Sequence, residues 1–373
     1  MICVFNELLL YIAKSLSMKK STFKITLALF AIVGSLIFLN SCEKDVSLVN
    51  ESNSKDECVI PVTVNAVQNE SITQVLTVAN IRALSDGVNY KVMFNKNAEI
   101  FDLSDASILA QLRQAFNSKK QIKVTFNPWM SKIEKITALS AAEIEQYKSI
   151  LPKLTKGISI NINASVSADE LDNVERLGVI NTTSPSTGLT NVIPDMATAQ
   201  LMFNYLTKQC CALSGPYGVD YCISFQYAED GCYARAHKMC YVLNNKYHYS
   251  THKIFSFANS GSDVLSVQAQ KWGGCCINWW YHVAPLVNIK TTTGVKAFVF
   301  DPAMFDQPVL LSVWLHAQKN PACAGTPGVS MINIQPTDSY APADYTGYAF
   351  VPDPSYSDTN STLVAYSNLV SCP

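Results

Sequence analysis

The chain has 373 residues, with 28 basic and 29 acidic side chains and a formal charge of −1 at neutral pH. This length has room for two domains together with targeting and linker segments. Lys and Arg do not cluster beyond the N-terminal region, so the sequence lacks the basic patch that nucleic-acid binding requires and excludes a nucleic-acid partner. Abundant Tyr and Phe, with few Leu-rich helical stretches, indicate a mixed α/β globular protein rather than a helical bundle.

The first 41 residues have the pattern of an export signal. Lys19, Lys20 and Lys24 precede an apolar run at 25–39, which is too short for an ordinary membrane-spanning helix and typical of a secretory signal. This basic start fits Met18 as the true start better than Met1. The run ends in Leu-Asn-Ser-Cys, which resembles a lipobox and predicts lipidation of Cys42; the alternative is an ordinary secretory signal in which Cys42 is incidental. We therefore expect an exported precursor, lipid-anchored to the bacterial envelope, and a mature domain that is released.

Four further segments follow the signal. Residues 42–61 are polar and form the expected tether, and residues 62–154 form a small α/β unit that contains no histidine. Residues 155–188 form a connector, in which the Ser-, Thr- and Pro-rich stretch at 182–188 is the expected processing site. All five histidines lie in the last segment, 189–373, which we interpret as the catalytic domain.

Local patterns predict the main elements of these segments. Alternating apolar residues predict strands at 89–94 and 121–126, with a helix between them. Ser140 and Glu143 form a capping box that begins another helix. The tail beyond Pro321 lacks periodicity, so we expect it to form loops that disulfides hold in place.

Nine cysteines follow residue 188, an odd number in a chain that is expected to leave the reducing cytoplasm. Eight of them can form four disulfides and leave one free thiol, and the adjacent Cys275 and Cys276 are expected to have different partners. No C-x-x-C pair occurs here, which argues against a zinc site, so we expect neither a metal nor a cofactor. The nine are Cys210, Cys211, Cys222, Cys232, Cys240, Cys275, Cys276, Cys323 and Cys372.

Cys232 is the candidate nucleophile. Asp230 is a plausible N-cap for a helix that runs to about residue 245, with Cys232 in its first turn. Backbone N–H groups and the helix dipole at such a position favour the thiolate, which is the nucleophilic form. The alternative reading is that Cys232 is one half of a disulfide.

His282 and Asp301 are the candidate partners of this cysteine. His282 lies in a predicted strand, and a second strand that begins near Val295 ends at Asp301. A turn at 291–294 joins the two strands into a hairpin, which places Asp301 opposite Ala284 and within side-chain reach of His282. Asp301 can then orient the imidazole while His282 faces the cysteine. The alternatives are a satisfied, half-buried histidine and a turn aspartate.

At these residues the sequence resembles the bacterial protein-glutaminase family, secreted enzymes that deamidate glutamine side chains within proteins. The most specific segment is Asp-Gly-Cys-Tyr-Ala-Arg-Ala-His-Lys-Met at 230–239. Supporting segments are 192–198, Cys275-Cys276 followed by 280–284, and Asp301-Pro302 with Phe305.

This resemblance implies an α+β fold with a transglutaminase-like, papain-like core, in which the helix that bears the nucleophile packs on an antiparallel sheet. The implied catalytic triad is Cys232, His282 and Asp301. It also implies that residues 62–154 are a pro-domain that inhibits the enzyme in the intact chain, with residues 97–99 in the substrate groove. The expected partners are proteins or peptides that bear glutamine, the chain's own pro-domain, an activating protease, and the membrane through the anchor of the precursor.

Three other functions stay open at this point. A transglutaminase forms the same thioester and passes it to an amine, and a cysteine protease would use a related core. A non-catalytic, disulfide-stabilised surface lipoprotein is the alternative from a different class.

Overall fold

The computed structural model describes residues 71–128, 130–149, 158–161, 189–207, 223–258, 264–324, 326–367 and 369–372. The chain divides into two compact units, 1–57 and 58–373, and all of the described residues belong to the second. The export signal, Cys42, the tether and the expected processing site lie outside the described residues. Within the described ranges, no helix has the length and apolar character needed to cross a membrane.

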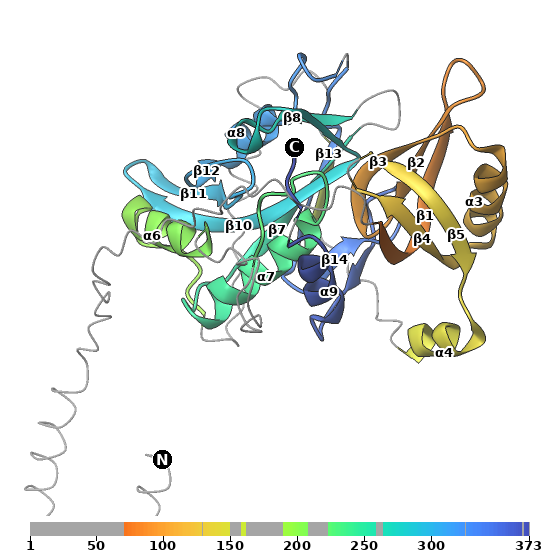
Figure 1. Ribbon diagram of the computed structural model, residues 1–373. Coiled ribbons are helices and arrows are strands. Elements are labelled where there is room, and N and C mark those ends of the chain that lie inside the picture. Colours follow the sequence, from red (N-terminus) through yellow and green to blue (C-terminus); the bar gives the residue numbers. More distant parts are fainter. Residues whose placement is uncertain are drawn as a thin grey trace, which may run out of the picture. The chain divides into compact units, whose positions relative to one another are not determined.

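The N-terminal sheet body is a small closed arrangement of strands with one covering helix (Figure 1). Because β2 pairs with both β1 and β3, the strand order β2-β1-β4-β5-β3 returns to its start. The strands predicted at 89–94 and 121–126 are confirmed. The elements are β1 (Ile72–Ala83), β2 (Tyr90–Phe94), β3 (Asn97–Leu103), α3 (Ala106–Ser118), β4 (Gln121–Asn127) and β5 (Lys132–Ala138).

Both helices of this part begin at side chains that satisfy free backbone N–H groups. Asp105 caps α3 by accepting from the amides of Ser107 and Ile108. Helix α4 (Ala141–Ser149) begins at the predicted capping box. There the Ser140 amide donates to Glu143 over 2.9 Å, and the Glu143 amide donates back to the Ser140 hydroxyl over 3.3 Å.

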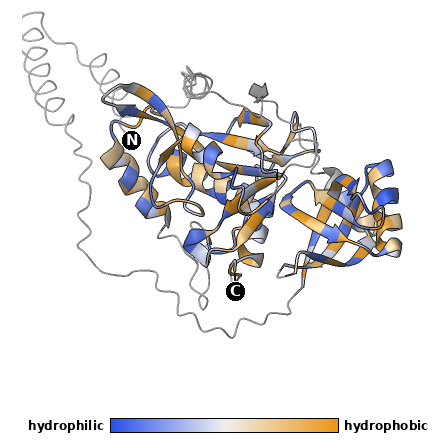
Figure 2. Cartoon of the chain, turned by 90° about the horizontal axis from the view of Figure 1, so that it is seen from above, coloured by the Kyte–Doolittle hydropathy of each residue, from blue (hydrophilic) through white to orange (hydrophobic). Residues whose placement is uncertain are grey.

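A six-stranded sheet forms the core of the remainder, in the order β12-β11-β10-β7-β13-β6. Helix α7 packs on β10, and α6 packs on both of them. Figure 2 shows apolar residues along the strands of both bodies, as expected for sheets with covered faces. The elements are β6 (Ile158–Asn161), α6 (Met196–Thr207), α7 (Cys232–Asn245), β7 (His252–Phe257), β10 (Tyr281–Thr291), β11 (Gly294–Val299), β12 (Val309–Leu310), α8 (Leu311–Ala317) and β13 (Met331–Gln335).

Two regions differ from the sequence-based expectation. The tail beyond Pro321 is not a set of loops, since it contributes β13, the hairpin of β14 (Ser339–Pro342) and β15 (Phe350–Pro352), and helix α9 (Ser357–Ala365). Every residue of β13 is buried, so this strand lacks the alternating pattern by which half-buried strands are recognised. The predicted connector also supplies an edge strand, because β6 pairs with β13.

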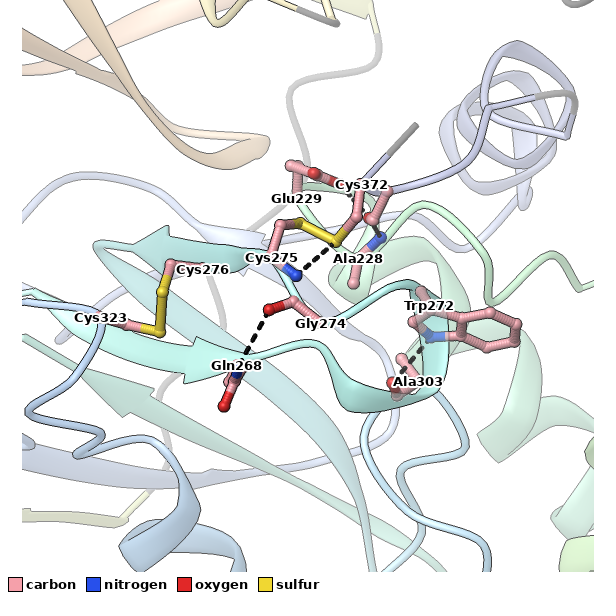
Figure 3. The surroundings of a disulfide bond; sticks show 11 residues. Ala228, Glu229, Gln268, Trp272, Gly274, Cys275, Cys276, Ala303, Cys323 and Cys372 are labelled. Carbon is pink, nitrogen blue, oxygen red and sulfur yellow. Dashed lines mark hydrogen bonds between the residues drawn. A yellow bond between two sulfur atoms is a disulfide. The ribbon is translucent and has the colours of Figure 1, made fainter. Parts of the chain in front are cut away.

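Two disulfides fasten the start of one short strand, β9 (Cys276–Trp279), which pairs with β8 (Leu265–Gln268) (Figure 3). Cys275 bonds to Cys372 and Cys276 bonds to Cys323, which confirms that the adjacent cysteines have different partners. Among the described cysteines, Cys232 and Cys240 are both free thiols, whereas four disulfides among the nine cysteines would leave only one free.

Candidate active site

Cys232 is the first residue of α7, as predicted, but the helix is not capped by Asp230. The N-cap residue is Gly231, with φ of 80°, and no side chain caps the helix there. A Cβ at Gly231 would come within 2.8 Å of the Tyr366 ring, so both the backbone angle and the close packing require glycine. The Asp230 carboxylate instead accepts from the Tyr233 hydroxyl in the first turn of α7, from the Tyr366 hydroxyl and from the Ala98 amide.

The Cys232 thiol is buried against β10. Its exposed fraction is 2% and it forms no disulfide. Burial raises the pKa of the thiol, and this outweighs the opposing effects of the nearby Arg235 guanidinium and of a hydrogen bond from the Val283 backbone. The expectation that the helix N-terminus makes Cys232 a thiolate is therefore wrong for the intact chain, in which the neutral thiol is the stable form.

The hairpin that carries His282 and Asp301 has the predicted register. Thr291 pairs with Gly294 and Leu286 with Val299, which continues to Ala284 opposite Asp301. The His282 Nε2 atom lies 2.7 Å from Asp301 Oδ2, and both residues are buried. The Nδ1 atom of His282 is also buried and has no hydrogen-bond partner. The backbone of Val283 forms a hydrogen bond to the Cys232 sulfur, and His282 is the residue immediately before Val283. The histidine next to the cysteine's contact therefore has a free Nδ1 atom.

Two tryptophans enclose the His282 ring. The Trp279 ring lies 4.2 Å from it and 6° from parallel, and the Trp314 ring lies 5.5 Å from it at 25°. Trp314 Nε1 also donates to Asp301 Oδ2 over 2.9 Å. Burial raises the pKa of Asp301, but the His282 and Trp314 contacts outweigh it, so the pKa lies below its usual value and Asp301 is a carboxylate. Sequence reasoning missed Trp314, because no pattern links α8 to this hairpin, and it assigned no role to Trp279, although Trp279 lies only three residues before His282.

Residues 97–99 of the N-terminal sheet body pack directly against this site. The Ala98 amide donates to Asp230 Oδ1 over 2.7 Å, and the Ala98 carbonyl accepts from the Trp280 amide over 3.1 Å. The Trp280 indole donates to the Asn97 carbonyl over 2.7 Å, and Glu99 pairs with Trp279 in an antiparallel bridge. Ala98 belongs to the same apolar cluster as Cys232. This segment therefore adds an extended strand next to Trp279 and Trp280, which lie just before His282 in the chain.

Three carboxyl groups meet at this contact. Glu99, Glu229 and Asp230 all have pKa values above their usual range, and burial is the largest cause for each. Neither Glu99 oxygen has a hydrogen-bond partner of ordinary geometry, although the Ser131 hydroxyl partly offsets the rise in its pKa. The negative charges of Asp230 and Glu229 raise the pKa of Glu99 further. Within the described residues, no group of side chains is arranged as metal ligands.

Comparison with known proteins gives related results at the family and structure levels. A family model described as a glutaminase matches residues 199–318. The solved structure of a pro-protein-glutaminase is 27% identical; the match covers 80% of this chain and 95% of that chain, with a TM-score of 0.57. A mutant of pro-protein-glutaminase matches at 26% identity over 80% of this chain and 93% of that chain, also with a TM-score of 0.57.

The protein-glutaminase from Chryseobacterium proteolyticum is 33% identical over 49% of this chain and 93% of that chain, with a TM-score of 0.41. No curated protein sequence matches the chain significantly. The expected resemblance is confirmed by the family model and by the match to the pro-form: the chain belongs to the protein-glutaminase family.

Proposed function

We propose that this chain is the zymogen of a protein-glutamine deamidase in which Cys232 is the nucleophile, on a transglutaminase-like core. Membership of the protein-glutaminase family supports the activity. One observation carries the residue assignment: a free thiol at a helix start contacts Val283, and the adjacent His282 has an unengaged Nδ1 while its Nε2 bonds to Asp301.

The first half of the reaction forms a thioester. His282 Nδ1 accepts the thiol proton, and the sulfur attacks the side-chain carbonyl carbon of a glutamine residue. A carbon–sulfur bond forms and the carbon–nitrogen bond breaks, while His282 returns the proton to the departing ammonia. Asp301 stabilises the imidazolium that exists between these two transfers, because its carboxylate already bonds to Nε2.

The second half hydrolyses the thioester. His282 removes a proton from water, whose oxygen attacks the same carbonyl carbon. The carbon–sulfur bond then breaks, the sulfur regains the proton, and a glutamate side chain leaves. The net reaction is glutamine plus water to glutamate plus ammonia.

We propose that residues 97–99 inhibit the intact chain and that residues 62–154 act as its pro-domain. Two features support this. The segment uses backbone groups at Trp280 and the carboxylate of Asp230, which an extended substrate would also need. The sulfur is also buried, and its pKa is raised, in the intact chain that contains this segment. A protease that cuts the 155–188 connector would allow the segment to leave, so that water could reach the thiol and lower its pKa.

We further propose that the precursor is exported and anchored through a lipid on Cys42, so that cleavage both activates and releases the enzyme. The apolar run that ends in Cys42 is the supporting feature, and it lies outside the described residues. Expression with a labelled fatty acid tests this proposal. Label and membrane association should both disappear in Cys42→Ala, and a wild-type precursor that is unlabelled and soluble would contradict it.

The activity is tested with the full chain, with and without limited proteolysis, on casein as substrate. We expect ammonia release after proteolysis, little from the intact chain, and none from Cys232→Ser in either form. Ammonia release together with isopeptide bonds, and without conversion of glutamine to glutamate, would identify a transglutaminase, and shortened casein would identify a protease. Ammonia release that survives in Cys232→Ser would contradict the nucleophile assignment.

A further inference from the structure

Trp314 makes two contacts with the triad that no other described residue combines. Its indole N–H donates to Asp301 Oδ2, the same oxygen that bonds to His282 Nε2. Its ring also lies 5.5 Å from the His282 ring. Trp279 covers His282 more closely, but its N–H donates to the Ala228 and Glu229 carbonyls and does not reach Asp301.

A buried chain of hydrogen bonds fixes Trp314 relative to the strand beside His282. The side-chain Nε2 of Gln318 donates to the backbone carbonyl of Trp314 over 3.0 Å, and the Ser256 hydroxyl donates to Gln318 Oε1 over 2.6 Å. Ser256 lies on β7, directly opposite His282 on β10. Trp314, Gln318 and Ser256 are each 0% exposed. Helix α8 is therefore held in register with the strand pair that carries the histidine.

We propose that Trp314 is a positioning residue for the triad: its N–H holds the Asp301 carboxylate in place and ionised, so that Asp301 orients His282 toward Cys232. This inference rests on the proposed deamidase function. A carboxylate that accepts two buried donors has one orientation, whereas a carboxylate with a single donor can rotate about its bond to the chain.

The charge of Asp301 depends on a small set of groups. His282 approaches it from β10 and the Arg235 guanidinium acts on it from α7, both favouring the carboxylate. Cys232, also on α7, is the like-charged group when it is a thiolate. Trp314 is the contribution from α8. Without the Trp314 N–H, fewer groups oppose the rise that burial causes in the pKa of Asp301. A larger fraction of Asp301 is then protonated as the pH falls.

The test uses the proteolytically activated full chain and four variants. Trp314→Phe keeps an aromatic ring beside His282 but removes the donor, and Asp301→Asn and the double variant complete a cycle. Trp272→Phe is the matched control, since it removes an indole N–H that donates to the Ala303 carbonyl and does not touch the triad. Ammonia release is measured across the acidic and neutral range, with kcat and KM separated.

We expect Trp314→Phe to lower kcat by about 10- to 100-fold, as for loss of a hydrogen bond to a charged group, with KM little changed. The acidic limb of the pH profile should move to higher pH. In the Asp301→Asn background, the same substitution should add less than about twofold, because residues that act as a unit are not additive. Trp272→Phe should keep the wild-type profile.

The proposal is overturned if Trp314→Phe keeps the wild-type acidic limb and kcat, or if it lowers activity equally in the wild-type and Asp301→Asn backgrounds. A second readout does not depend on activity. In the ¹⁵N-labelled full chain, the His282 Nε2 proton should shift or exchange faster in Trp314→Phe but not in Trp272→Phe. An unchanged signal contradicts the positioning role, whereas an inactive wild-type enzyme with the expected signal contradicts only the proposed function.

Discussion

Two carboxyl groups around the N-terminus of α7 are equally buried, yet their pKa values move in opposite directions. Glu99 and Asp301 are each 3% exposed. Asp301 bonds to His282 and Trp314, and its pKa is lowered. Glu99 has no hydrogen-bond partner of ordinary geometry and lies near two other acids, and its pKa is raised. Burial alone therefore does not determine the charge, which depends on the groups that surround each carboxyl.

The two carboxyl groups also belong to different parts of the molecule: Asp301 to the candidate active site, and Glu99 to the contact made by the N-terminal sheet body. The His282–Asp301 pair is built within one hairpin and supported by α8, so we expect it to persist after residues 97–99 have left. The Glu99 contact exists only while the N-terminal sheet body is docked, and it buries an acid at a cost in free energy. In the zymogen that we propose, the cost of burying Glu99 favours release of residues 97–99 once the connector is cut.

The largest expected effect comes from removing the nucleophile. Cys232→Ala should lower ammonia release by the activated enzyme by about 10⁴-fold or more, because no other group can form the thioester. The measurement is ammonia release from casein. Cys240→Ala, which removes the other described free thiol, is the control and should keep most of the activity.

The role of the Asp301 carboxylate is tested by Asp301→Asn. An amide can bond to His282 but cannot stabilise the imidazolium, so kcat should fall by about 10²- to 10⁴-fold. The free energy of unfolding should change little, because asparagine keeps the shape of the aspartate side chain. Equal kcat for Asp301→Asn and wild type would show that this buried carboxylate has no part in the reaction.

Removal of the disulfides tests how far the stability of the protein depends on β9, the strand that carries Trp279. Removing either bridge should lower the free energy of unfolding by about 2–5 kcal/mol, measured with denaturant. The Cys275–Cys372 bridge spans 97 residues and the Cys276–Cys323 bridge spans 47, so the longer loop should cost about 0.6 kcal/mol more. A much larger difference would show that the tail at 369–372 also supports the loop before Cys232, which it contacts through Ser371.

The smallest expected effect concerns Glu99, in the contact made by the N-terminal sheet body. Glu99→Gln should stabilise the intact precursor by about 1–3 kcal/mol at neutral pH, because it removes an unpaired buried acid. The sign follows from the raised pKa: docking is fully stable below the ordinary pKa of glutamate and weakens as the pH rises through the raised value. The gap in melting temperature between acidic and alkaline pH should therefore narrow in Glu99→Gln.

A matched control for this variant lies on the same strand. Asp102 is exposed on β3 and pairs with Lys91 at 2.5 Å. Asp102→Asn should leave the gap between acidic and alkaline melting temperatures as in wild type. If both variants narrow it equally, Glu99 has no special role in the pH dependence of docking.

Local signals predicted the parts of the site that depend on nearby residues. The turn at 291–294 set the register that brings His282 to Asp301, and the position of Cys232 at a helix start followed from the flanking pattern. The helix cap was wrong because Asp230 is occupied by Tyr366 and Ala98, which lie more than a hundred residues away. Trp314, β13 and β6 were missed for the same reason, since their roles depend on distant partners that no local period reveals.

The central claim is that Cys232 carries the acyl group of the substrate during turnover. Rapid quenching of the activated enzyme with a glutamine peptide, followed by mass spectrometry, tests it most directly. The claim predicts a transient adduct on Cys232 whose mass equals the peptide less one ammonia, and its absence in Cys232→Ser. Ammonia release without any adduct on Cys232, or an adduct on another residue, would contradict it.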